Sequence, residues 1–351
     1  MKVKKRLKAV LRTMAVLSSK ISYMNENTAK NILCSFSPDP ATTCIAENVL
    51  SIQYDLQIIV PAYNVEKYIA QCLESALNQK TNYSYFVTVV NDGSTDGTLD
   101  IIRAYQERYP NRIEVIDQQN QGFSGARNVA MKILKGKYIT FLDSDDILVN
   151  GAVEALLRAT EDGTEIVQGN WYTGVELVGD TTCIKRVQAL SGYPWGKVFK
   201  AEILEHFQFP KGYWFEDTPI SFILYGKGYN FKNISDIVYG YRLNPNGITV
   251  KSRTSKRSIE SYWITALCLR EFSAFGVLYD QRAYEYLLQQ CIMNWERTAK
   301  QPKNVREAIF VLEAELIEKY FKNMCSNNNK EIEKALRKKQ FRKFEILAWT
   351  R

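Results

Sequence analysis

Residues 138–146 read Tyr-Ile-Thr-Phe-Leu-Asp-Ser-Asp-Asp, an apolar run that ends in a carboxylate-rich turn. The apolar half is typical of a buried β-strand. The acidic half, 143–146, suits Mg²⁺ or Mn²⁺, because these ions take carboxylate oxygens and commonly share their coordination with substrate phosphates. A short acidic string by itself is more often a solvated turn, so its interpretation depends on the surrounding sequence.

The surrounding sequence alternates between strand and helix patterns. Further strands are predicted at 56–60, 86–90 and 113–116, and helices at 65–79, 95–109 and 124–134. Strands separated by helices of this length predict right-handed crossovers and a largely parallel sheet. In such sheets ligands bind beyond the carboxyl ends of the strands, so a site is expected in the segments that follow the strands.

Polar clusters follow three of the four predicted strands. They are 61–64 (Pro-Ala-Tyr-Asn), 91–97 (Asn-Asp-Gly-Ser-Thr-Asp-Gly) and 143–146. The second cluster is also ordinary turn chemistry, in which Thr95 or Asp96 caps the next helix, and both interpretations can hold together. The Gly-containing loop 121–128 enters a helix, where backbone N–H groups meet anions. Arg127 in this loop either reaches a phosphate or base edge, or is a surface arginine.

Four segments together resemble the successive signatures of family 2 inverting glycosyltransferases with the GT-A fold. They are 58–64 (Ile-Ile-Val-Pro-Ala-Tyr-Asn), 90–96 (Val-Asn-Asp-Gly-Ser-Thr-Asp), 122–128 and 141–146. The resemblance covers about residues 54–170. It implies an α/β protein whose GT-A-type nucleotide-binding domain has a mostly parallel central sheet. It also implies sugar transfer from a nucleotide diphosphate donor, often a uridine diphosphate (UDP) sugar.

The same resemblance implies roles for individual residues. The expected donor-binding set is Pro61, Ala62, Tyr63, Glu66, Asp92, Arg127, Asp143 and Ser144. Within this set Asp92 is expected at the base or ribose, and Asp143 near the ribose and the metal. Asp145 is the expected ligand of Mn²⁺ or Mg²⁺, which would neutralise the departing diphosphate.

Beyond residue 170, three segments resemble those of bacterial polysaccharide members of the family. They are 193–200 with a W-x-K pattern, 214–219 with a Glu-Asp pair, and 239–242 with a Y-x-Y-R pattern that suggests a phosphate contact for Arg242. Inversion by direct displacement needs a base that takes the acceptor hydroxyl proton. The resemblance implies Asp217 as this base and Glu216 as second choice, whereas the plainer interpretation is a cap for a helix near Thr218. The expected acceptor-side residues are Trp195, Lys197 and Trp214.

Composition excludes several other classes of enzyme. His206 is the only histidine, which excludes Ser-His-Asp triads and H-E-x-x-H metalloproteases. Seven cysteines occur without a C-x-x-C pair, a pattern typical of reduced thiols. No window approaches the roughly 18 apolar residues of a membrane span, and the N-terminus lacks the uninterrupted apolar region of a signal peptide. A cytoplasmic protein is therefore expected.

The net charge of +8 is concentrated at the two ends of the chain. Residues 3–21 place apolar side chains at helical spacing beside Lys4, Lys5 and Lys8. This amphipathic helix either lies on an anionic membrane surface or packs against the protein itself. The C-terminal stretch 331–349 is also basic but less amphipathic, and no motif supports nucleic-acid binding.

We therefore expect three parts. Residues 1–53 form an N-terminal amphipathic helix and connector, 54–250 the GT-A domain (nucleotide-binding half 54–150, acceptor-binding half 151–250), and 251–351 a C-terminal helical region. The expected function is inverting transfer to a hydroxyl of a glycan or polyprenyl-linked glycan in cell-surface polysaccharide biosynthesis, at the inner face of the membrane. The alternatives are a sugar-nucleotide hydrolase or nucleotidyltransferase on the same fold, or a catalytically dead membrane-associated scaffold.

Overall fold

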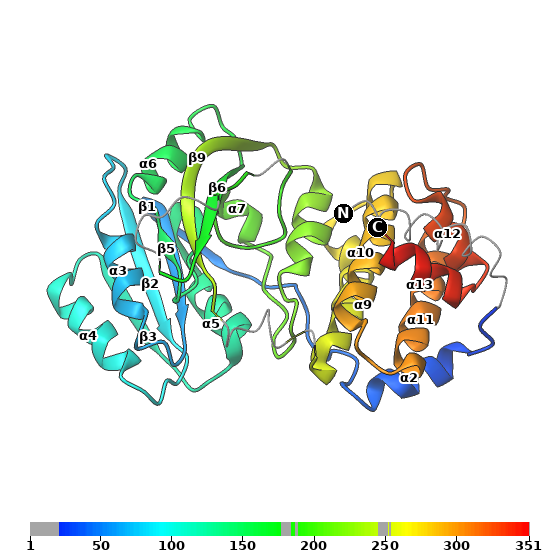
Figure 1. Cartoon of the computed structure of the whole chain (residues 1–351). Coiled ribbons are helices and arrows are strands. Elements are labelled where there is room, and N and C mark those ends of the chain that lie inside the picture. Colours follow the sequence, from blue (N-terminus) through cyan, green and yellow to red (C-terminus); the bar gives the residue numbers. More distant parts are fainter. Residues whose placement is uncertain (1–20, 177–183, 187–188, 245–251, 253, 351) are drawn as a thin grey trace. The chain divides into compact units, whose positions relative to one another are not determined.

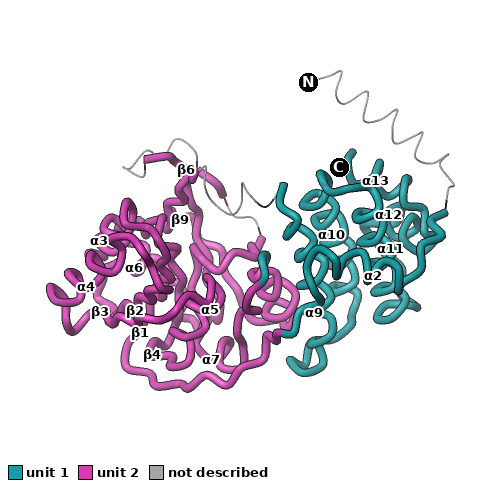
Figure 2. The backbone as a smooth tube through the Cα atoms, turned by 90° about the horizontal axis from the view of Figure 1, so that it is seen from below, with its two compact units in different colours: residues 1–41, 213–215, 246–351 teal, residues 42–212, 216–245 magenta. Residues whose placement is uncertain are grey.

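The chain folds into two compact units. A computed structural model describes residues 21–176, 184–186, 189–244, 252 and 254–350. Unit 1 combines residues 1–41, 213–215 and 246–351, and unit 2 combines residues 42–212 and 216–245. Figure 1 labels the elements, and Figure 2 gives each unit its own colour. The described strands all lie in unit 2, and the described part of unit 1 is helical.

Unit 2 alternates between strands and helices along its first half. Its elements in chain order are β1 (Val49–Ala62), α3 (Ile69–Leu77), β2 (Tyr85–Asn91), α4 (Thr98–Arg108), β3 (Ile113–Asp117), α5 (Gly122–Met131), β4 (Ile133–Phe141), β5 (Ile147–Leu148), α6 (Ala152–Arg158), β6 (Ile166–Gly174), β7 (Ile184–Lys185), β8 (Lys197–Lys200), α7 (Ala201–Leu204), the π-helical turn η1 (Ile220–Leu224), the 3-10 turn η2 (Tyr225–Lys227) and β9 (Phe231–Arg242).

One sheet holds these strands in the order β3-β2-β1-β4-β8-β6-β9-β5, with β7 paired to β6. The first four strands in this order are parallel, as the crossover pattern predicts. Strand β8 runs antiparallel to β4 and β6, so the second half of the sheet is mixed. The register pairs Ala62 with Asn91 and Ile59 with Phe141. The turns that follow β1, β2 and β4 therefore leave the sheet at one edge.

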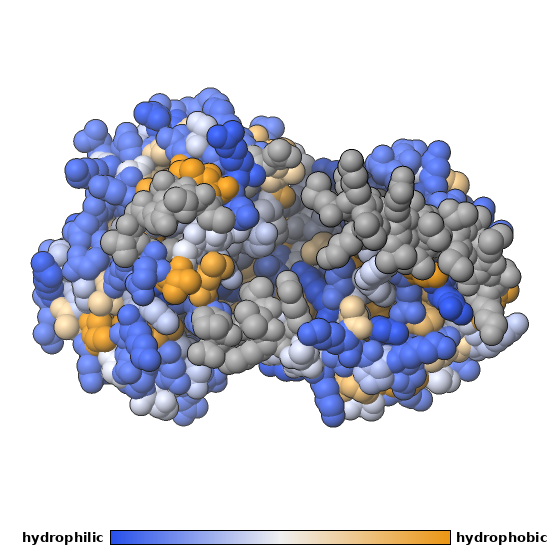
Figure 3. Space-filling view, viewed as in Figure 1, coloured by the Kyte–Doolittle hydropathy of each residue, from blue (hydrophilic) through white to orange (hydrophobic). Residues whose placement is uncertain are grey.

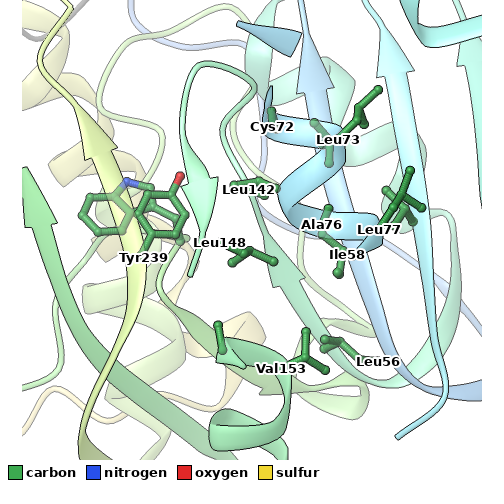
Figure 4. Packing of buried hydrophobic residues seen from close by; sticks show 14 of the residues in the cluster. Leu56, Ile58, Cys72, Leu73, Ala76, Leu77, Leu142, Leu148, Val153 and Tyr239 are labelled. Carbon is green, nitrogen blue, oxygen red and sulfur yellow. The ribbon is translucent and has the colours of Figure 1, made fainter. Parts of the chain in front are cut away.

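Strand β1 contributes side chains to both faces of the sheet. Leu56, Ile58 and Val60 are fully buried and belong to the same apolar cluster as Leu73 and Leu77 of α3. Figure 4 shows part of this cluster, in which side chains of α3 and β1 take part together. Side chains alternate between the two faces of a strand, so Leu56, Ile58 and Val60 share one face of β1. This is the face that meets α3.

The boundary between α5 and β4 differs from the prediction. The helix ends at Met131 instead of residue 134, and the strand begins at Ile133. The reason is a strand pairing: Val49 and Leu50 pair with Ile133 and Leu134, which extends β1 and β4 together. Local helical spacing could not reveal this partner, because it lies more than 80 residues away in sequence.

Unit 1 is built from α-helices and short 3-10 turns. Its described elements are α2 (Glu26–Cys34), η3 (Lys256–Ile259), α9 (Glu260–Glu271), η4 (Phe272–Phe275), α10 (Gln281–Thr298), α11 (Lys303–Phe321), α12 (Lys330–Arg337) and α13 (Phe341–Trp349). Helix α2 lies in the predicted connector and contacts α11. The last amphipathic stretch is two helices, separated at Lys339, which has a left-handed φ of 51°. The predicted helix at 3–21 lies almost entirely outside the described residues.

The surface drawn in Figure 3 is mainly hydrophilic, with separate apolar patches. In the part of the chain that the structure describes, no helix is long and apolar enough to cross a bilayer. The basic C-terminal stretch makes ion pairs within unit 1: Arg337 with Glu333 at 3.0 Å and Lys343 with Glu331 at 2.7 Å. The first pair lies within α12 and the second joins α13 to α12, so the basic side chains hold these two helices together.

Candidate active site

Hydrogen bonds join the turns that follow β1 and β2. The Asp92 N–H donates to the Ala62 carbonyl over 2.9 Å. Asn64, in the left-handed region at φ 50°, accepts from the Thr95 N–H at 2.8 Å. These bonds place the turn that carries the half-exposed Tyr63 beside the turn that carries Asp92.

Glu66 caps a helix. One carboxylate oxygen accepts from the Gly97 N–H at 2.8 Å, at the N-terminus of α4, and the Glu66 N–H donates to Asp96 at 3.2 Å. A carboxylate is stabilising at this end of a helix because the unpaired N–H groups carry partial positive charge. The structure therefore gives Glu66 a structural contact at the edge of the expected donor site.

Asp92 is buried and faces the loop that opens α5. Its Oδ1 accepts from the Gln121 N–H at 2.8 Å and from the Gln118 amide at 2.6 Å. The next residue, Gly93, has φ 72°, and a Cβ there would lie 2.9 Å from the Asn120 nitrogen. Only glycine fits this position without strain, because the two loops approach so closely.

The acidic turn 143–146 is held in shape by the end of β9. Asp146 is buried and accepts from the Tyr239 hydroxyl and from the Arg242 N–H, both at 2.7 Å. The Tyr239 oxygen accepts in turn from the Asp143 N–H at 3.1 Å. The Arg242 guanidinium donates to the Asp145 carbonyl at 2.7 Å. Arg242 therefore has a positioning contact with the turn, and the phosphate contact that its motif suggests stays a prediction.

The turn carries more negative charge than its contacts offset. Burial, and then the charge of Asp143, raises the pKa of Asp145. Burial, and then both neighbouring aspartates, raises the pKa of Asp146 well above its usual range. Mutual repulsion of this kind is relieved by a cation. Asp146 is committed to Tyr239 and Arg242, whereas Asp145 Oδ2 accepts a longer 3.3 Å bond from the Asn244 amide.

The donor set fits the expected metal. Carboxylate oxygens at Asp145 and Asp143 are ligands that Mg²⁺ and Mn²⁺ accept. Within the described ranges, no group of three or more His, Cys, Asp or Glu side chains was found that could hold a metal ion. Oxygens of other kinds, such as those of water or of a bound diphosphate, would complete the coordination around these two aspartates.

Arg127 joins the acidic turn to the Glu-Asp pair. Its guanidinium donates to Asp143 at 2.7 Å and to Glu216 at 2.6 Å, and its side chain is 6% exposed. Burial opposes the charge of this group, but the two carboxylates raise the pKa of Arg127 overall. Burial raises the pKa of Glu216 to about 7, although Arg127 opposes that shift. The interpretation of Arg127 as a surface arginine is therefore wrong.

Asp217 lies next to this bridge and within electrostatic range of three groups. They are Glu216, Tyr193 and the ammonium group of Lys197. Lys197 is fully buried, and its Nζ donates to the Ser191 carbonyl at 2.6 Å and to the Tyr225 hydroxyl at 3.0 Å. Burial lowers the pKa of Lys197 well below its usual range, and Asp217 opposes that shift.

The expected acceptor-side residues do not all fall in one unit. Trp195 and Lys197 lie in unit 2, where Trp195 forms a parallel bridge with Phe141 at the end of β4. Trp214 lies in unit 1, where its N–H donates to Glu260 at 2.7 Å and Arg257 stacks over its ring. Lys197 is fully buried and bonded to Ser191 and Tyr225, so its geometry favours a structural contact over direct contact with an acceptor.

Within unit 2 the remaining expected residues surround one sheet edge. Contacts link Asp143 through Arg127 to Glu216. Pro61 is buried near the end of β1, and Ser144 is buried in the turn that follows β4. The sequence did not predict Tyr239, Asp146 and Asn244 as residues that shape the acidic turn. Tyr239 and Tyr241 are two residues apart on β9, and this spacing is the sequence signal that both rings lie on one face of the strand.

Residues 57–208 match the family model described as "Glycosyl transferase family 2". This region belongs to glycosyl transferase family 2. The match spans β1 through α7 and holds the turns that carry Asp92 and Asp145. Glu216 and Asp217 lie outside the matched region, which ends at residue 208.

Curated proteins match parts of the chain. Glycosyltransferase GlyA of Streptococcus pneumoniae is 31% identical over 55% of this chain and 31% of its own length. Chondroitin synthase of Escherichia coli is 46% identical over 29% of this chain and 15% of its own length. Poly(ribitol-phosphate) beta-glucosyltransferase of Bacillus spizizenii is 44% identical over 29% and 16%. The chain thus spans at most about a third of the length of these three relatives.

Two solved structures resemble the chain as a whole. TarS 1–349 of Staphylococcus aureus, in complex with UDP-GlcNAc, has a TM-score of 0.60 at 21% identity and covers 83% of this chain and 89% of its own. Mannosyltransferase PcManGT from Pyrobaculum calidifontis, in complex with GDP-Man and Mn²⁺, has a TM-score of 0.51 at 16% identity and covers 98% and 97%. At these identities the likeness shows a shared fold, and it confirms the expected α/β fold class with a helical C-terminal region.

Proposed function

We propose that the protein is an inverting glycosyltransferase. It would move a sugar from a nucleotide diphosphate donor, which we propose to be a UDP-sugar. The acceptor would be a hydroxyl of a glycan or lipid-linked glycan in cell-surface polysaccharide biosynthesis. The observation that carries this proposal is the Arg127 bridge, which ties the acidic turn after β4 to the Glu216–Asp217 segment. Family 2 membership of residues 57–208 supports the same reaction class.

The turns after β1 and β2 would hold the nucleoside. Tyr63 offers a half-exposed aromatic ring, and Asp92 is fixed beside it by the Gln121 N–H. A rigid carboxylate and a flat ring at one sheet edge are chemically suited to a base and a ribose, because the base can stack while the carboxylate accepts hydrogen bonds. The backbones of Pro61 and Ala62 would form the floor of this subsite.

Asp145 and Asp143 would hold Mn²⁺ or Mg²⁺ together with the donor diphosphate. A divalent cation supplies Lewis-acid stabilisation of the leaving diphosphate when it is bound. The raised pKa of Asp145, caused by burial and by Asp143, supports a cation between these carboxylates. The Mn²⁺ in the PcManGT complex, a protein of the same fold, is consistent with this choice.

Asp217 would be the base that takes the acceptor hydroxyl proton. Displacement with inversion places the acceptor opposite the leaving group, so the base must lie across the sugar from the diphosphate. Arg127 holds Glu216 in a buried ion pair at 2.6 Å, so the Glu216 carboxylate is already committed to a structural contact. Asp217 is the base that the family resemblance implies. Glu216 would then position the segment instead of acting as the base.

The acceptor class stays open at this level. One relative is named for chondroitin and another for poly(ribitol-phosphate), so both a sugar hydroxyl and an alditol hydroxyl are compatible with the family.

We propose that the protein lies at the inner face of the membrane, because basic residues are concentrated at positions 2–12 and would be attracted to anionic lipids. Vesicle flotation tests it: replacing Lys4, Lys5 and Lys8 by Gln should reduce binding to anionic vesicles, and unchanged binding would exclude it.

A donor panel tests the proposed reaction. The full chain is incubated with UDP-, GDP- and dTDP-sugars, Mn²⁺ or Mg²⁺ and bacterial glycan fractions, and the products are separated. Transfer predicts a nucleoside diphosphate and a glycosylated acceptor in equal amounts. A free sugar with no glycosylated product would indicate a hydrolase. A parallel incubation with sugar 1-phosphates and nucleoside triphosphates tests for a nucleotidyltransferase, which would release pyrophosphate and form a sugar nucleotide. No turnover of any donor would leave the scaffold alternative.

A further inference from the structure

Five aromatic side chains form one stacked cluster in unit 2. Tyr193 stacks on Trp195 with ring centroids 4.6 Å apart and planes 3° from parallel. Trp195 stacks on Tyr239 at 4.6 Å and on Tyr241 at 5.5 Å. Trp171 meets Trp195 edge-on at 5.2 Å and 80°. Offset stacks and edge-on contacts at these separations are favourable aromatic geometries, so the cluster holds its rings in fixed planes.

The stack is closed at one end and open at the other. Tyr239 is fully buried and Trp195 is 7% exposed, whereas Tyr193 is 40% exposed. One face of the Tyr193 ring is covered by Trp195 because the two rings are parallel. The exposed area of Tyr193 therefore belongs to its outer face and edge. This arrangement leaves a flat aromatic face with rigid support beneath it open to a ligand.

The cluster lies between the acidic turn and Asp217. At its closed end the Tyr239 hydroxyl contacts both Asp146 and the Asp143 N–H. At its open end the pKa of Tyr193 is raised by burial and then by the charge of Asp217, so Asp217 lies within electrostatic range of this ring. The cluster therefore joins the acidic turn by hydrogen bonds at its closed end and comes within electrostatic range of the proposed base at its open end.

The segment that carries Tyr193 is anchored by buried hydrogen bonds. The Ser191 N–H and hydroxyl both donate to the Gln168 amide oxygen, at 3.0 and 2.7 Å. Lys197 holds the Ser191 carbonyl at 2.6 Å, and the Tyr225 hydroxyl donates to the same carbonyl at 2.6 Å. These bonds fix the backbone two residues before Tyr193, so the ring is preorganised before any ligand arrives.

We infer that the outer face of Tyr193 is a stacking surface for the pyranose ring of the sugar acceptor. The inference rests on the proposed function and narrows its acceptor class. A pyranose ring presents a flat patch of C–H groups, which matches the negative face of an aromatic ring. An open-chain alditol phosphate presents no such face, and its phosphates would approach the carboxylates of Glu216 and Asp217.

The cations described near this end of the site are already engaged. Arg127 is paired with Asp143 and Glu216, and Lys197 is held by Ser191 and Tyr225. A polyanionic acceptor would need arginine or lysine side chains aimed at its phosphates. A neutral sugar ring needs none, so the charge pattern favours the same acceptor class as the aromatic stack.

Acceptor binding by Tyr193 variants tests the inference. Methyl β-D-glucopyranoside, the methyl β-glycosides of N-acetylglucosamine and N-acetylgalactosamine, and ribitol 5-phosphate are titrated onto the full chain with UDP and Mn²⁺, using saturation-transfer NMR. Tyr193→Leu replaces the aromatic ring by a smaller aliphatic side chain, and Tyr193→Phe keeps the aromatic face. Tyr23→Leu is the matched control, because Tyr23 is 93% exposed in unit 1.

The wild type and Tyr193→Phe should bind at least one methyl glycoside, with the strongest transfer to ring protons of one face. Tyr193→Leu should weaken that binding about fivefold or more, as expected for loss of one aromatic stack, with UDP affinity and thermal stability unchanged. Equal binding by Tyr193→Leu, or binding of ribitol 5-phosphate in preference to every glycoside, would overturn the inference. If glycosides stack on Tyr193 but no sugar nucleotide is turned over, Tyr193 is still a sugar-binding surface, and the proposed glycosyl transfer is rejected instead.

Discussion

At the scale of single residues, Asp217 carries the proposed chemistry. Replacing Asp217 by Asn removes the base while keeping the size of the side chain. We expect transfer to fall by about 10²- to 10⁴-fold, the usual cost of losing a general base, with UDP affinity within twofold of wild type. Rates of UDP release and calorimetric titration of UDP measure the two effects. Asp236→Asn, an exposed change on β9, is the control. Transfer above a tenth of the wild-type rate would reject Asp217 as the base.

Asp145 should act on the donor instead. Asp145→Asn keeps the hydrogen-bonding shape of the turn but removes one ligand charge. We expect the Mn²⁺-dependent gain in UDP affinity to fall by at least about 10- to 100-fold, because loss of an outer-shell group alone has that effect and Asp145 is proposed as a direct ligand. Calorimetry with and without Mn²⁺ measures this gain. Asp100→Asn, an exposed change in the first turn of α4, should leave it intact. An unchanged gain in Asp145→Asn would exclude this residue as a ligand.

Sequence patterns predict the acidic turn and the Asp92 turn but not the side-chain contacts that join distant residues. The acidic turn and the Asp92 turn are visible in the sequence because each directly follows an apolar run, and strand ends of a parallel sheet share an edge. The contact of Arg127 with Glu216 joins residues 89 apart, and no local pattern signals it. Trp214 was grouped with Trp195 by motif, yet the two lie in different units.

At the scale of elements, α5 links the acidic turn to the 216–219 segment through Arg127. Breaking a buried ion pair leaves its partners unpaired, which typically costs about 3 to 5 kcal/mol. We therefore expect Arg127→Met to lower the free energy of unfolding of unit 2 by about that amount in urea titrations. Arg103→Met is the matched control, because its pair with Asp117 is about half exposed and should contribute at most about 1 kcal/mol. Equal losses in the two variants would contradict the bridge.

A buried carboxylate lies in the packing of α11 against α10. Glu313 is fully buried, and its Oε1 accepts from the Asn294 amide at 2.9 Å. Among the described residues its Oε2 has no hydrogen-bond partner. Burial raises the pKa of Glu313 well above its usual range. Because the folded state then holds a proton that the unfolded chain releases, stability falls as the pH rises above the unfolded pKa of about 4.3.

Glu313→Gln should remove this pH dependence. The free energy of unfolding of the wild type is expected to fall between pH 5 and pH 8, with a slope of at most about 1.4 kcal/mol per pH unit from this group. The variant should be the more stable protein at pH 8 and close to wild type at pH 5. Urea unfolding at several pH values measures this. Glu318→Gln, an exposed change on the same helix, should follow the wild type, and a wild-type slope in Glu313→Gln would contradict the assignment.

Element boundaries depended on partners distant in sequence. The periodic patterns identify α3, α4, β2 and β3 closely, because their own residues bury one face or one stripe. The start of β4 is decided by its pairing with β1, and the break between α12 and α13 by the left-handed Lys339. Both features depend on backbone pairing or conformation that side-chain spacing does not encode.

At the scale of the whole molecule, chain order and spatial grouping differ. Unit 1 gathers residues from both ends of the chain and the short segment 213–215, so no single cut in the sequence separates the units. Phe215, the last residue of that segment, has a left-handed φ of 64°, and Arg297 of unit 1 stacks over its ring at 4.2 Å. The chain therefore enters the proposed catalytic segment, which begins at Glu216, directly from a residue held in unit 1.

The central claim is that the sheet edge after β1, β2 and β4 binds a nucleotide diphosphate together with a cation. An experimental structure of the full chain with UDP and Mn²⁺ tests it most directly, because the anomalous signal of manganese locates the ion independently of the protein atoms. We predict the ion at the carboxylates of Asp145 and Asp143 with the diphosphate bound to it, and the uridine beside Tyr63 and Asp92. Manganese or uridine bound away from this edge would contradict the account.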